Sequence, residues 1–273
     1  MSDASGPIGM FDSGVGGLAV LIETHRLLPG EDIIYYADSA WFPYGSRPAR
    51  EIRERSAEVT RLLLERSAKV IVVACNTATS SAIASLRETF DVPFVGMEPA
   101  LKPAAEQTLA GRVALLVTPG TAKGEKLAAL IDRFGSEVHV ETIAAPELAE
   151  RVESGALDEP STRELVRRYV GEVRRSGADV LALGCTHYAF LRPMFEEEAG
   201  DGLSVIEPSA AVARQVQRVL AARQLRSGRA SGGRVLYLTS GDAQTFAQAR
   251  ERLAAAGADL PAASPDGWAA SAS

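Results

Sequence analysis

The chain has 273 residues, enough for one large domain or two small ones, and its apolar (46%) and charged (23%) fractions are those of an ordinary globular protein. A formal net charge of −6 argues against a nucleic-acid partner, because proteins that bind nucleic acids normally carry a basic stripe. The sequence has no signal-peptide pattern and no apolar run of the ~18 residues that span a bilayer, and its two cysteines fit a reducing compartment, so we expect a cytoplasmic enzyme with no membrane partner.

A glycine-rich loop follows the first expected strand. The apolar run at residues 7–11 ends in the motif DSGVGG at residues 12–17, and an apolar helix is expected at residues 18–28. Because glycines let backbone N–H groups approach an anion, the loop is a candidate ligand-binding loop. It lacks the G-x-G-x-x-G spacing of dinucleotide-binding loops, which disfavours a dinucleotide.

Alternating strands and helices fill the rest of the first half. Strands are expected at residues 33–37 and 93–97, and a helix at about residues 80–90. After Asp38 comes a loop of aromatic and turn residues, and Ser46 and Pro48 then mark the start of another helix. The arginines of that helix alternate with glutamates, which indicates a solvent-exposed face and not a basic patch.

Two further strands end in a cysteine. Residues 69–79 read KVIVVACNTAT, an apolar strand followed by Cys75, and residues 179–188 read DVLALGCTHY, an apolar strand followed by Cys185. The chain has no other cysteine. Polar side chains at the carboxyl ends of buried parallel strands lie where open α/β sheets bind ligands, so this pair is the main functional signal in the sequence.

The second half repeats the plan of the first. An apolar strand at residues 113–117 ends in the motif TPGT and leads into a helix, much as the first strand leads into its loop. Thr118 follows Asp12 by 106 residues, and Cys185 follows Cys75 by 110. Ser161 and Glu164 form the pattern of a capping box at the start of the next helix, and Gly177 is expected to end that helix.

The C-terminal part continues the alternation. A strand at residues 203–206 precedes a helix that reaches about residue 225, followed by a Ser/Gly/Arg linker at residues 226–234. A strand at residues 235–239 and a helix at residues 244–253 are expected next. The Ala/Ser/Pro-rich tail at residues 257–273 is expected to be disordered.

Two thiols at the ends of duplicated strands would face each other if the halves pack about a pseudo-two-fold axis. That geometry suits removal of a proton from one face of a carbon and delivery to the other, with Asp12 near the first thiol and His187 near the second. A free cysteine has a pKa of about 8.5 and acts as a base only when deprotonated. A zinc site is disfavoured, because two distant cysteines and three scattered histidines do not supply four close ligands.

Structural alternatives exist for these residues. A lone buried cysteine usually acts as a small apolar side chain, and only the duplicated context favours function. His187 could be a core histidine with satisfied hydrogen bonds, and Asp12 could only cap the following helix. Tyr44 and Gly45 could be simple turn residues.

Four motifs carry a resemblance to a known family: DSGVGGL at residues 12–18, PYG at 43–45, ACNTA at 74–78 and GCTHY at 184–188. They resemble the motifs of the glutamate racemases, in the cofactor-independent aspartate/glutamate racemase superfamily, and the match runs in order over about residues 7–253. Glu207-Pro208-Ser209 departs from the Asp-Ser pair usual in the family, and Ser46 stands where threonine is common.

The resemblance implies an α/β fold with two pseudo-symmetric three-layer domains, mainly parallel sheets and an active site in the cleft between them. Residues 1–98 with 208–256 would form the first domain, and residues 99–207 the second. The enzyme would racemise glutamate without a cofactor or a metal and supply D-glutamate for bacterial peptidoglycan. Two alternative functions stay open: racemisation of aspartate or a hydantoin, and a non-catalytic amino-acid-binding module. A homodimer is also possible.

The resemblance also implies residue roles. Cys75 would exchange the α-proton of D-glutamate and Cys185 that of L-glutamate, assisted by Asp12 and His187. The substrate-binding residues would be Asp12, Ser13, Tyr44, Gly45, Asn76, Thr77, Thr186 and His187. Supporting roles would fall to Asp38, Glu153, Thr118 and Thr121.

Overall fold

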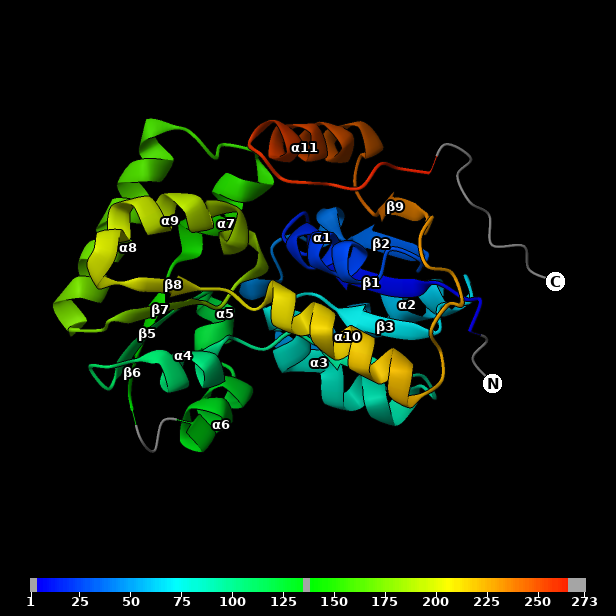
Figure 1. Cartoon of the computed structure of the whole chain (residues 1–273), viewed down its shortest axis with the longest axis horizontal. Coiled ribbons are helices and arrows are strands. Elements are labelled where there is room, and N and C mark those ends of the chain that lie inside the picture. Colours follow the sequence, from blue (N-terminus) through cyan, green and yellow to red (C-terminus); the bar gives the residue numbers. More distant parts are fainter. Residues whose placement is uncertain (1–3, 135–137, 265–273) are drawn as a thin grey trace.

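The computed structural model describes residues 4–134 and 138–264, whose strands form two separate parallel sheets (Figure 1). The order is β4-β3-β1-β2-β9 in the first sheet and β6-β5-β7-β8 in the second. The first sheet comprises β1 (Ile8–Asp12), β2 (Ile33–Ala37), β3 (Val70–Val73), β4 (Phe94–Gly96) and β9 (Val235–Thr239). The second comprises β5 (Arg112–Val117), β6 (His139–Ala144), β7 (Val180–Leu183) and β8 (Ser204–Ile206). The predicted parallel α/β class is confirmed.

The first four strands of each half have the same order in their sheet. In the first, β1 lies between β2 and β3, and β4 flanks β3; in the second, β5 lies between β6 and β7, and β8 flanks β7. The internal repeat predicted from the spacing of Asp12, Cys75, Thr118 and Cys185 is therefore present in the strand order. The one addition is β9, which the returning C-terminal segment places beside β2.

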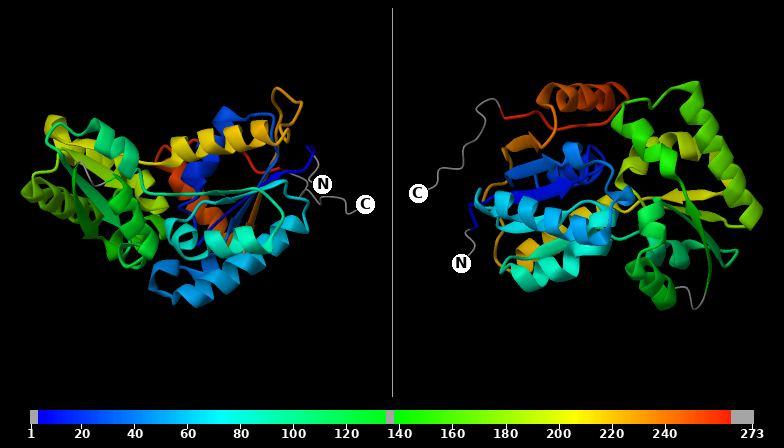
Figure 2. Two further views of the ribbon diagram at one scale, coloured as in Figure 1. Left: turned by 90° about the horizontal axis from the view of Figure 1, so that it is seen from below. Right: turned by 180° about the vertical axis from the view of Figure 1, so that it is seen from behind.

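Helices cover both faces of each sheet, so each half has three layers (Figures 1 and 2). On the first sheet, α1 (Leu18–Leu27) and α10 (Ser209–Ala222) share one face, and α2 (Ala49–Leu64) and α3 (Asn76–Thr89) the other. On the second, α4 (Leu101–Gln107) and α6 (Glu125–Phe134) lie opposite α7 (Pro146–Glu153), α8 (Pro160–Ser176) and α9 (Arg192–Ala199). The last helix, α11 (Ala243–Ala255), packs its buried side beside β9 and extends toward the second sheet.

Alternation along each strand divides the core. In β1, Ile8 and Met10 join the cluster under α1 and α10, whereas Phe11 joins the cluster under α2 and α3. In β7, Leu181 and Leu183 face one layer, and Val180 and Ala182 face the other. Successive side chains on a strand point to opposite faces, so a strand buried on both sides must be apolar throughout. These runs end where the chain leaves the sheet, and the polar motifs begin there.

The start of α3 differs from the prediction. A helix was expected from about residue 80, but α3 begins at Asn76 and Cys75 is its N-cap residue. The Cys75 sulfur accepts a hydrogen bond from the Ala78 N–H at 3.5 Å, as the side chain of an N-cap residue does. The run Asn-Thr-Ala-Thr-Ser-Ser has weak helix propensity, and its position at the end of a buried strand outweighs that propensity.

The start of α8 also differs. The predicted capping box of Ser161 and Glu164 is wrong, because the N-cap is Glu159 and Pro160 occupies the first helical position. Proline suits that position, since its missing N–H would be unbonded there anyway. At the other end the prediction is confirmed: Gly177 ends α8 in the left-handed conformation, with φ of 75°.

Part of the expected disordered tail is ordered. Ser264 donates a backbone hydrogen bond to the Val235 carbonyl at 2.9 Å, and the Tyr237 hydroxyl donates one to the Pro261 carbonyl at 2.7 Å. Leu260 packs against the core. These contacts tie residues 257–264 to the open edge of β9, while residues 265–273 lie outside the described part of the chain.

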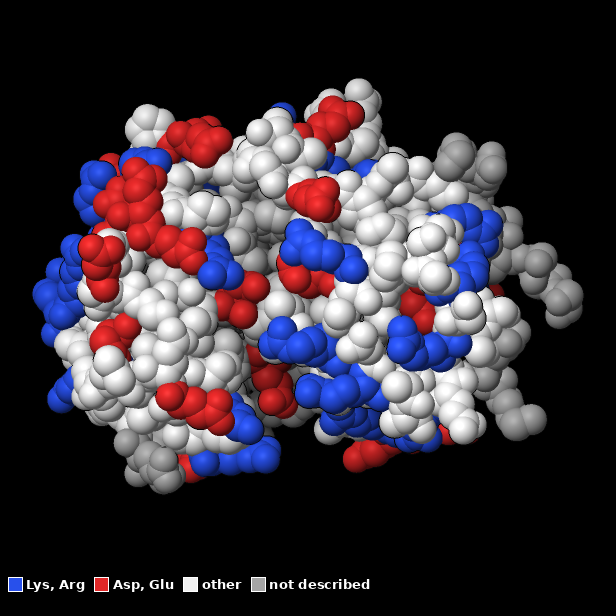
Figure 3. Space-filling view, in the orientation of Figure 1, with Lys and Arg blue, Asp and Glu red and all other residues white. Residues whose placement is uncertain are grey.

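Surface charges of both signs are mixed. On the face shown in Figure 3, basic side chains are most numerous around α10, and acidic ones gather at the upper left, over the second sheet. The predicted exposed charged face of α2 is confirmed, since Arg50 pairs with Glu54 at 2.8 Å and both side chains are largely exposed. Across residues 4–134 and 138–264, no helix is long and apolar enough to cross a membrane.

Candidate active site

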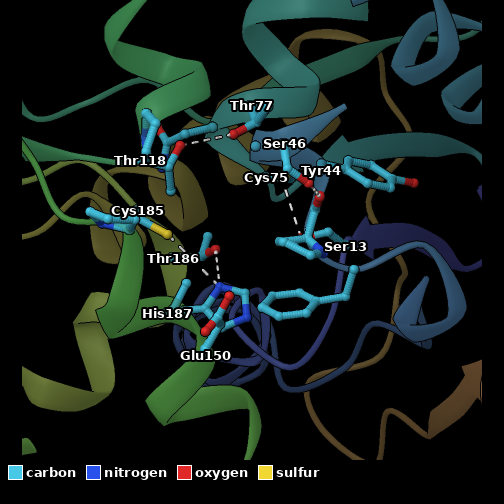
Figure 4. A pocket seen from close by; sticks show the side chains of 17 residues that line it. Ser13, Tyr44, Ser46, Cys75, Thr77, Thr118, Glu150, Cys185, Thr186 and His187 are labelled. Atoms are coloured by element: carbon cyan, nitrogen blue, oxygen red, sulfur yellow. Dashed lines mark hydrogen bonds between the residues drawn. The ribbon is translucent and has the colours of Figure 1, made fainter. Parts of the chain in front are cut away.

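Both cysteines line one pocket between the two sheets, with a volume of about 170 Å³ (Figure 4). Cys75 follows β3, and Cys185 follows β7, the equivalent strand of the second sheet. Most of the predicted residues line this pocket with them: Ser13, Tyr44, Gly45, Asn76, Thr77, Thr118, Thr186 and His187. The other four predicted residues do not line the pocket and lie behind its lining residues: Asp12, Asp38, Thr121 and Glu153.

The Cys75 thiol is buried and has few polar neighbours. Its sulfur lies 4.0 Å from the Ser13 hydroxyl and accepts the Ala78 N–H bond at the start of α3. Burial raises the pKa of the Cys75 thiol well above its usual value, and the nearby Asp12 charge raises it further, against the opposing effect of the Ala78 N–H. The resting form of Cys75 is therefore the thiol, which can deliver a proton.

Asp12 lies at the end of β1 and is completely buried. One carboxylate oxygen, Oδ2, accepts the Gly17 N–H at 2.9 Å, while Oδ1 has no hydrogen-bond partner among the described residues. Burial raises the pKa of Asp12, and the positive charge of His187 opposes that rise. Asp12 thus closes the glycine-rich loop. The alternative that it caps the following helix is wrong, because Gly17 is the N-cap residue of α1 and no side chain caps that helix. Asp12 also lies close enough to Cys75 to influence its proton.

A chain of polar groups begins at Cys185. Its sulfur lies 3.8 Å from Nδ1 of His187, and Nε2 of His187 lies 2.9 Å from Oε2 of Glu153. Burial lowers the pKa of His187, but its bonds to Cys185 and Glu153 outweigh burial and leave the pKa well above the usual value. Nδ1 of His187 therefore lies where it can exchange a proton with the Cys185 sulfur, so the second half also places a proton-transfer group beside its thiol.

Tyr44 and Gly45 belong to the loop that closes the first half over the pocket. The Tyr44 hydroxyl donates to Asp38 at 2.5 Å, and Arg55 of α2 binds both oxygens of the same carboxylate, at 2.6 and 2.8 Å. Asp38 is fully buried, and Tyr44 and Arg55 bind its carboxylate oxygens. Asp38 therefore stabilises the Tyr44 loop from the side away from the pocket. The structure does not bring Asp38 to the reacting centre.

Three threonine hydroxyls meet between the halves. Thr77 of α3 lies 3.3 Å from both Thr118 and Thr121, and those two are 3.0 Å apart. Thr118 is the N-cap residue of the short helix α5 (Pro119–Ala122), and Thr121 lies within that helix. Beside them, the Asn76 amide is buried, and neither its nitrogen nor its oxygen has a hydrogen-bond partner among the described residues. Asn76, Thr77 and Thr118 line the pocket, so they can donate hydrogen bonds to an acidic ligand there.

Sequence reasoning assigned no role in the site to several residues that line the pocket: Phe42, Pro43, Ser46, Pro119, Pro146, Ala149 and Glu150. The Phe42 ring lies 5.3 Å from the His187 ring. Pro146 and Glu147 are a usable signal for the start of α7, because proline and an acidic residue favour the first helical turn. Nothing local in the sequence indicates which cleft that helix would face.

In the described ranges 4–134 and 138–264, no group of three or more His, Cys, Asp or Glu residues is arranged to hold a metal ion. Both cysteines are free.

Comparison with known proteins gives a consistent result. The family model described as Asp/Glu/Hydantoin racemase matches residues 16–216. A glutamate racemase of Herpetosiphon aurantiacus is 50% identical over 247 residues, which cover 90% of this chain and 97% of that protein.

Solved structures agree. Glutamate racemase isoform RacE1 from Bacillus anthracis superposes with a TM-score of 0.84 at 29% identity, covering 92% of this chain and 94% of that one. The glutamate racemase of Escherichia coli, solved in complex with L-glutamate, superposes with a TM-score of 0.80 at 33% identity, covering 91% and 95%.

Proposed function

The chain belongs to the Asp/Glu/Hydantoin racemase family, and we propose that it interconverts L-glutamate and D-glutamate by proton transfer at Cα between two thiols. The observation that carries the proposal is the pair Cys75 and Cys185, which end equivalent strands of a duplicated fold and line one pocket. The names of its relatives support glutamate as the substrate.

The proposed mechanism gives each thiol one face of the substrate. With L-glutamate, the Cys185 thiolate removes the α-proton and the Cys75 thiol delivers its own proton to the opposite face. With D-glutamate the two sulfurs exchange roles. Each turnover breaks one C–H bond and forms one, and a proton moves from one sulfur to the other, so no electrons or cofactor are required.

An α-proton is far less acidic than a thiol, so the pocket must stabilise the developing carbanion. We assign that task to hydrogen-bond donors on the substrate carboxylates: the buried Asn76 amide, the hydroxyls of Ser13, Thr77 and Thr186, and the backbone near Gly45. Donors placed in advance in a water-poor site stabilise charge more strongly than water does. The N-terminus of α3, next to Cys75, adds a favourable dipole.

The same donors explain the proposed specificity for glutamate. Its side-chain carboxylate needs hydrogen-bond partners of its own, and the threonines between the halves supply them. Losing a charged hydrogen-bond partner costs about 1.5–3 kcal/mol, which corresponds to roughly 10- to 100-fold in specificity, so glutamine should be a poor substrate.

The cleft would lie between two domains, residues 1–98 with 208–256 and residues 99–207. In the cell we propose a cytoplasmic role, consistent with two free thiols, in supplying D-glutamate for peptidoglycan.

A racemisation assay followed by circular dichroism tests the proposal. The purified full chain, dialysed against a chelator and without added pyridoxal phosphate, should racemise either enantiomer of glutamate. Aspartate and glutamine serve as comparison substrates. Comparable turnover of aspartate would place the protein with another activity of the family, and dependence on an added metal or pyridoxal phosphate would contradict the thiol mechanism.

A further inference from the structure

α7 forms one wall of the substrate pocket, and its N-terminal end is held within the second half. Three of its residues line the pocket: Pro146, Ala149 and Glu150. Just before the helix, the Ala145 N–H donates a hydrogen bond to the Val117 carbonyl at 2.9 Å, and the Ala145 carbonyl accepts one from the buried Tyr188 hydroxyl at 2.5 Å. Val117 ends β5 and Tyr188 follows β7, so both partners belong to the half that contains α7.

The C-terminal end of α7 is held from the other half, by α11, which packs beside β9 of the first sheet. Ser154 is the C-cap residue of α7, and its carbonyl accepts a hydrogen bond from Nη1 of Arg252 at 2.7 Å. The two residues are 98 positions apart in the chain. The last carbonyls of a helix carry partial negative charge, so a guanidinium group is favourable at this position.

The side chain of Arg252 lies against the turn that follows α7. Gly155 has a left-handed backbone, with φ of 75°, and a Cβ there would lie 2.5 Å from Cδ of Arg252. Next to this contact, Leu157 of the second half and Leu253 of α11 are buried in the same core cluster and line the same hollow, of about 380 Å³. The missing side chain at residue 155 therefore lets the arginine reach the helix end.

A second hydrogen bond crosses between the halves at this end of α7. Oε2 of Glu153 accepts the Val15 N–H at 2.9 Å. Glu153 makes this bond through a side chain with several rotatable bonds, so a small shift of the helix need not break it. Arg252 instead binds a backbone carbonyl, and it therefore constrains the position of the α7 backbone relative to the first half.

We propose that Arg252 is a positioning residue for substrate binding, which holds the C-terminal end of α7 against the first half and so keeps the α7 wall closed on bound glutamate. This inference rests on the proposed function, because that function names the ligand in the pocket. Without the bond, the C-terminal end of α7 moves away from the pocket while its N-terminal end stays fixed. A ligand binds less tightly when its binding-competent state is less populated, so KM rises.

The first test is the kinetics of Arg252→Met. This variant keeps an unbranched side chain against Gly155 but removes the charge and the hydrogen bond to Ser154. Arg252 is exposed, so we expect the modest effect of one hydrogen bond at the surface: KM should rise roughly 3- to 10-fold for both L-glutamate and D-glutamate. The turnover number should be kept, because neither thiol contacts Arg252.

Hydrogen–deuterium exchange of the free, full-length enzyme gives a second readout that does not depend on activity. The backbone N–H groups of residues 154–156 donate to carbonyls of α7, at 2.8 to 3.0 Å. Exchange measured by mass spectrometry over residues 146–157 should be several-fold faster in Arg252→Met, and exchange elsewhere should stay unchanged.

Two further variants control the test. Arg252→Lys keeps a positive donor that can reach the Ser154 carbonyl, so it should restore most of the wild-type KM and exchange. Arg218→Met removes an exposed arginine of α10 that bonds to Gln215 in its own helix, and it should change neither.

An unchanged KM, or unchanged exchange over residues 146–157, in Arg252→Met would overturn the proposal. A lower melting temperature with faster exchange throughout the chain would also overturn it, because Arg252 would then only stabilise the fold. A wild-type enzyme that does not racemise glutamate would instead refute the proposed function, and exchange over residues 146–157 would still decide whether Arg252 holds α7.

Discussion

Gly45, which lines the pocket, meets Gly120 backbone to backbone between the two halves. A Cβ on Gly120 would lie 2.5 Å from the carbonyl oxygen of Gly45 and 2.9 Å from its Cα. Gly45 belongs to the loop of the first half, and Gly120 to α5 of the second, so two glycines set how closely the halves approach. The atoms that would clash are backbone atoms, which cannot turn aside as a flexible side chain can.

Gly120→Ala should therefore weaken substrate binding. Alanine suits the local helical conformation, so the effect comes from the clash with Gly45, and overpacking of this kind costs about 1–3 kcal/mol. We expect KM for glutamate to rise roughly tenfold. The melting temperature should change little, because the clash lies between the two halves and not within a core. Steady-state kinetics in both directions measure the effect.

Gly202→Ala is the matched control, because its added Cβ would have no heavy atom within 4 Å among the described residues, its chain neighbours apart. It should leave KM unchanged. If Gly120→Ala behaves like this control, the contact with Gly45 does not set the closure of the pocket.

Replacement of either thiol tests the two-base assignment. A serine hydroxyl is a far weaker acid and base than a thiol at neutral pH, so Cys75→Ser and Cys185→Ser should each lower kcat by about 10²- to 10⁴-fold or more. Circular dichroism of the backbone should show that both variants keep the fold. Near-normal turnover by either variant would refute the assignment.

The two thiols could be found from sequence because their signal is local. An apolar strand that ends in a cysteine and small polar residues is visible in one short window, and its repetition at a spacing of 110 residues identifies the partner. The same holds for Gly177, whose left-handed conformation follows from its type and place. The similarity of the two sheets likewise follows from two similar series of strands and helices, whereas the order of the strands within each sheet was not predicted.

Other parts of the site depend on contacts between distant segments. The family resemblance predicts Asp38 as a supporting acid. In the structure its carboxylate forms an ion pair with Arg55, 17 residues later in the chain, on the side away from the pocket. Glu150 enters the pocket only because α7 packs beside the turn that follows Cys185. Packing between distant segments decides whether an acidic side chain lines the pocket or lies behind it. Local sequence patterns do not indicate this packing.

Arg55 should matter for stability through Asp38. Among the described residues, Arg55→Met leaves the buried Asp38 carboxylate with the Tyr44 hydroxyl as its side-chain partner, and loss of a partner for a buried charge destabilises by on the order of 2 kcal/mol. Urea denaturation should show this loss of unfolding free energy, and KM should rise because the Tyr44 loop is released. Arg50→Met, on the exposed face of the same helix, should change the unfolding free energy by less than about 0.5 kcal/mol. Equal effects of the two variants would show that Asp38 does not depend on Arg55.

His187 should make stability depend on pH in a definite direction. Its pKa in the folded protein lies well above the usual 6.5, because the bonds to Cys185 and Glu153 outweigh burial. A raised pKa means that the folded state holds the proton more tightly than the unfolded chain, so the stabilisation is complete below pH 6.5 and is lost as pH rises toward the folded value. The difference in unfolding free energy between the wild type and His187→Gln should therefore shrink as pH rises above 6.5. Urea titrations at a series of pH values measure it, with His139→Gln, an exposed histidine outside the site, as the control. A difference that grows with pH would mean that His187 is neutral in the folded protein.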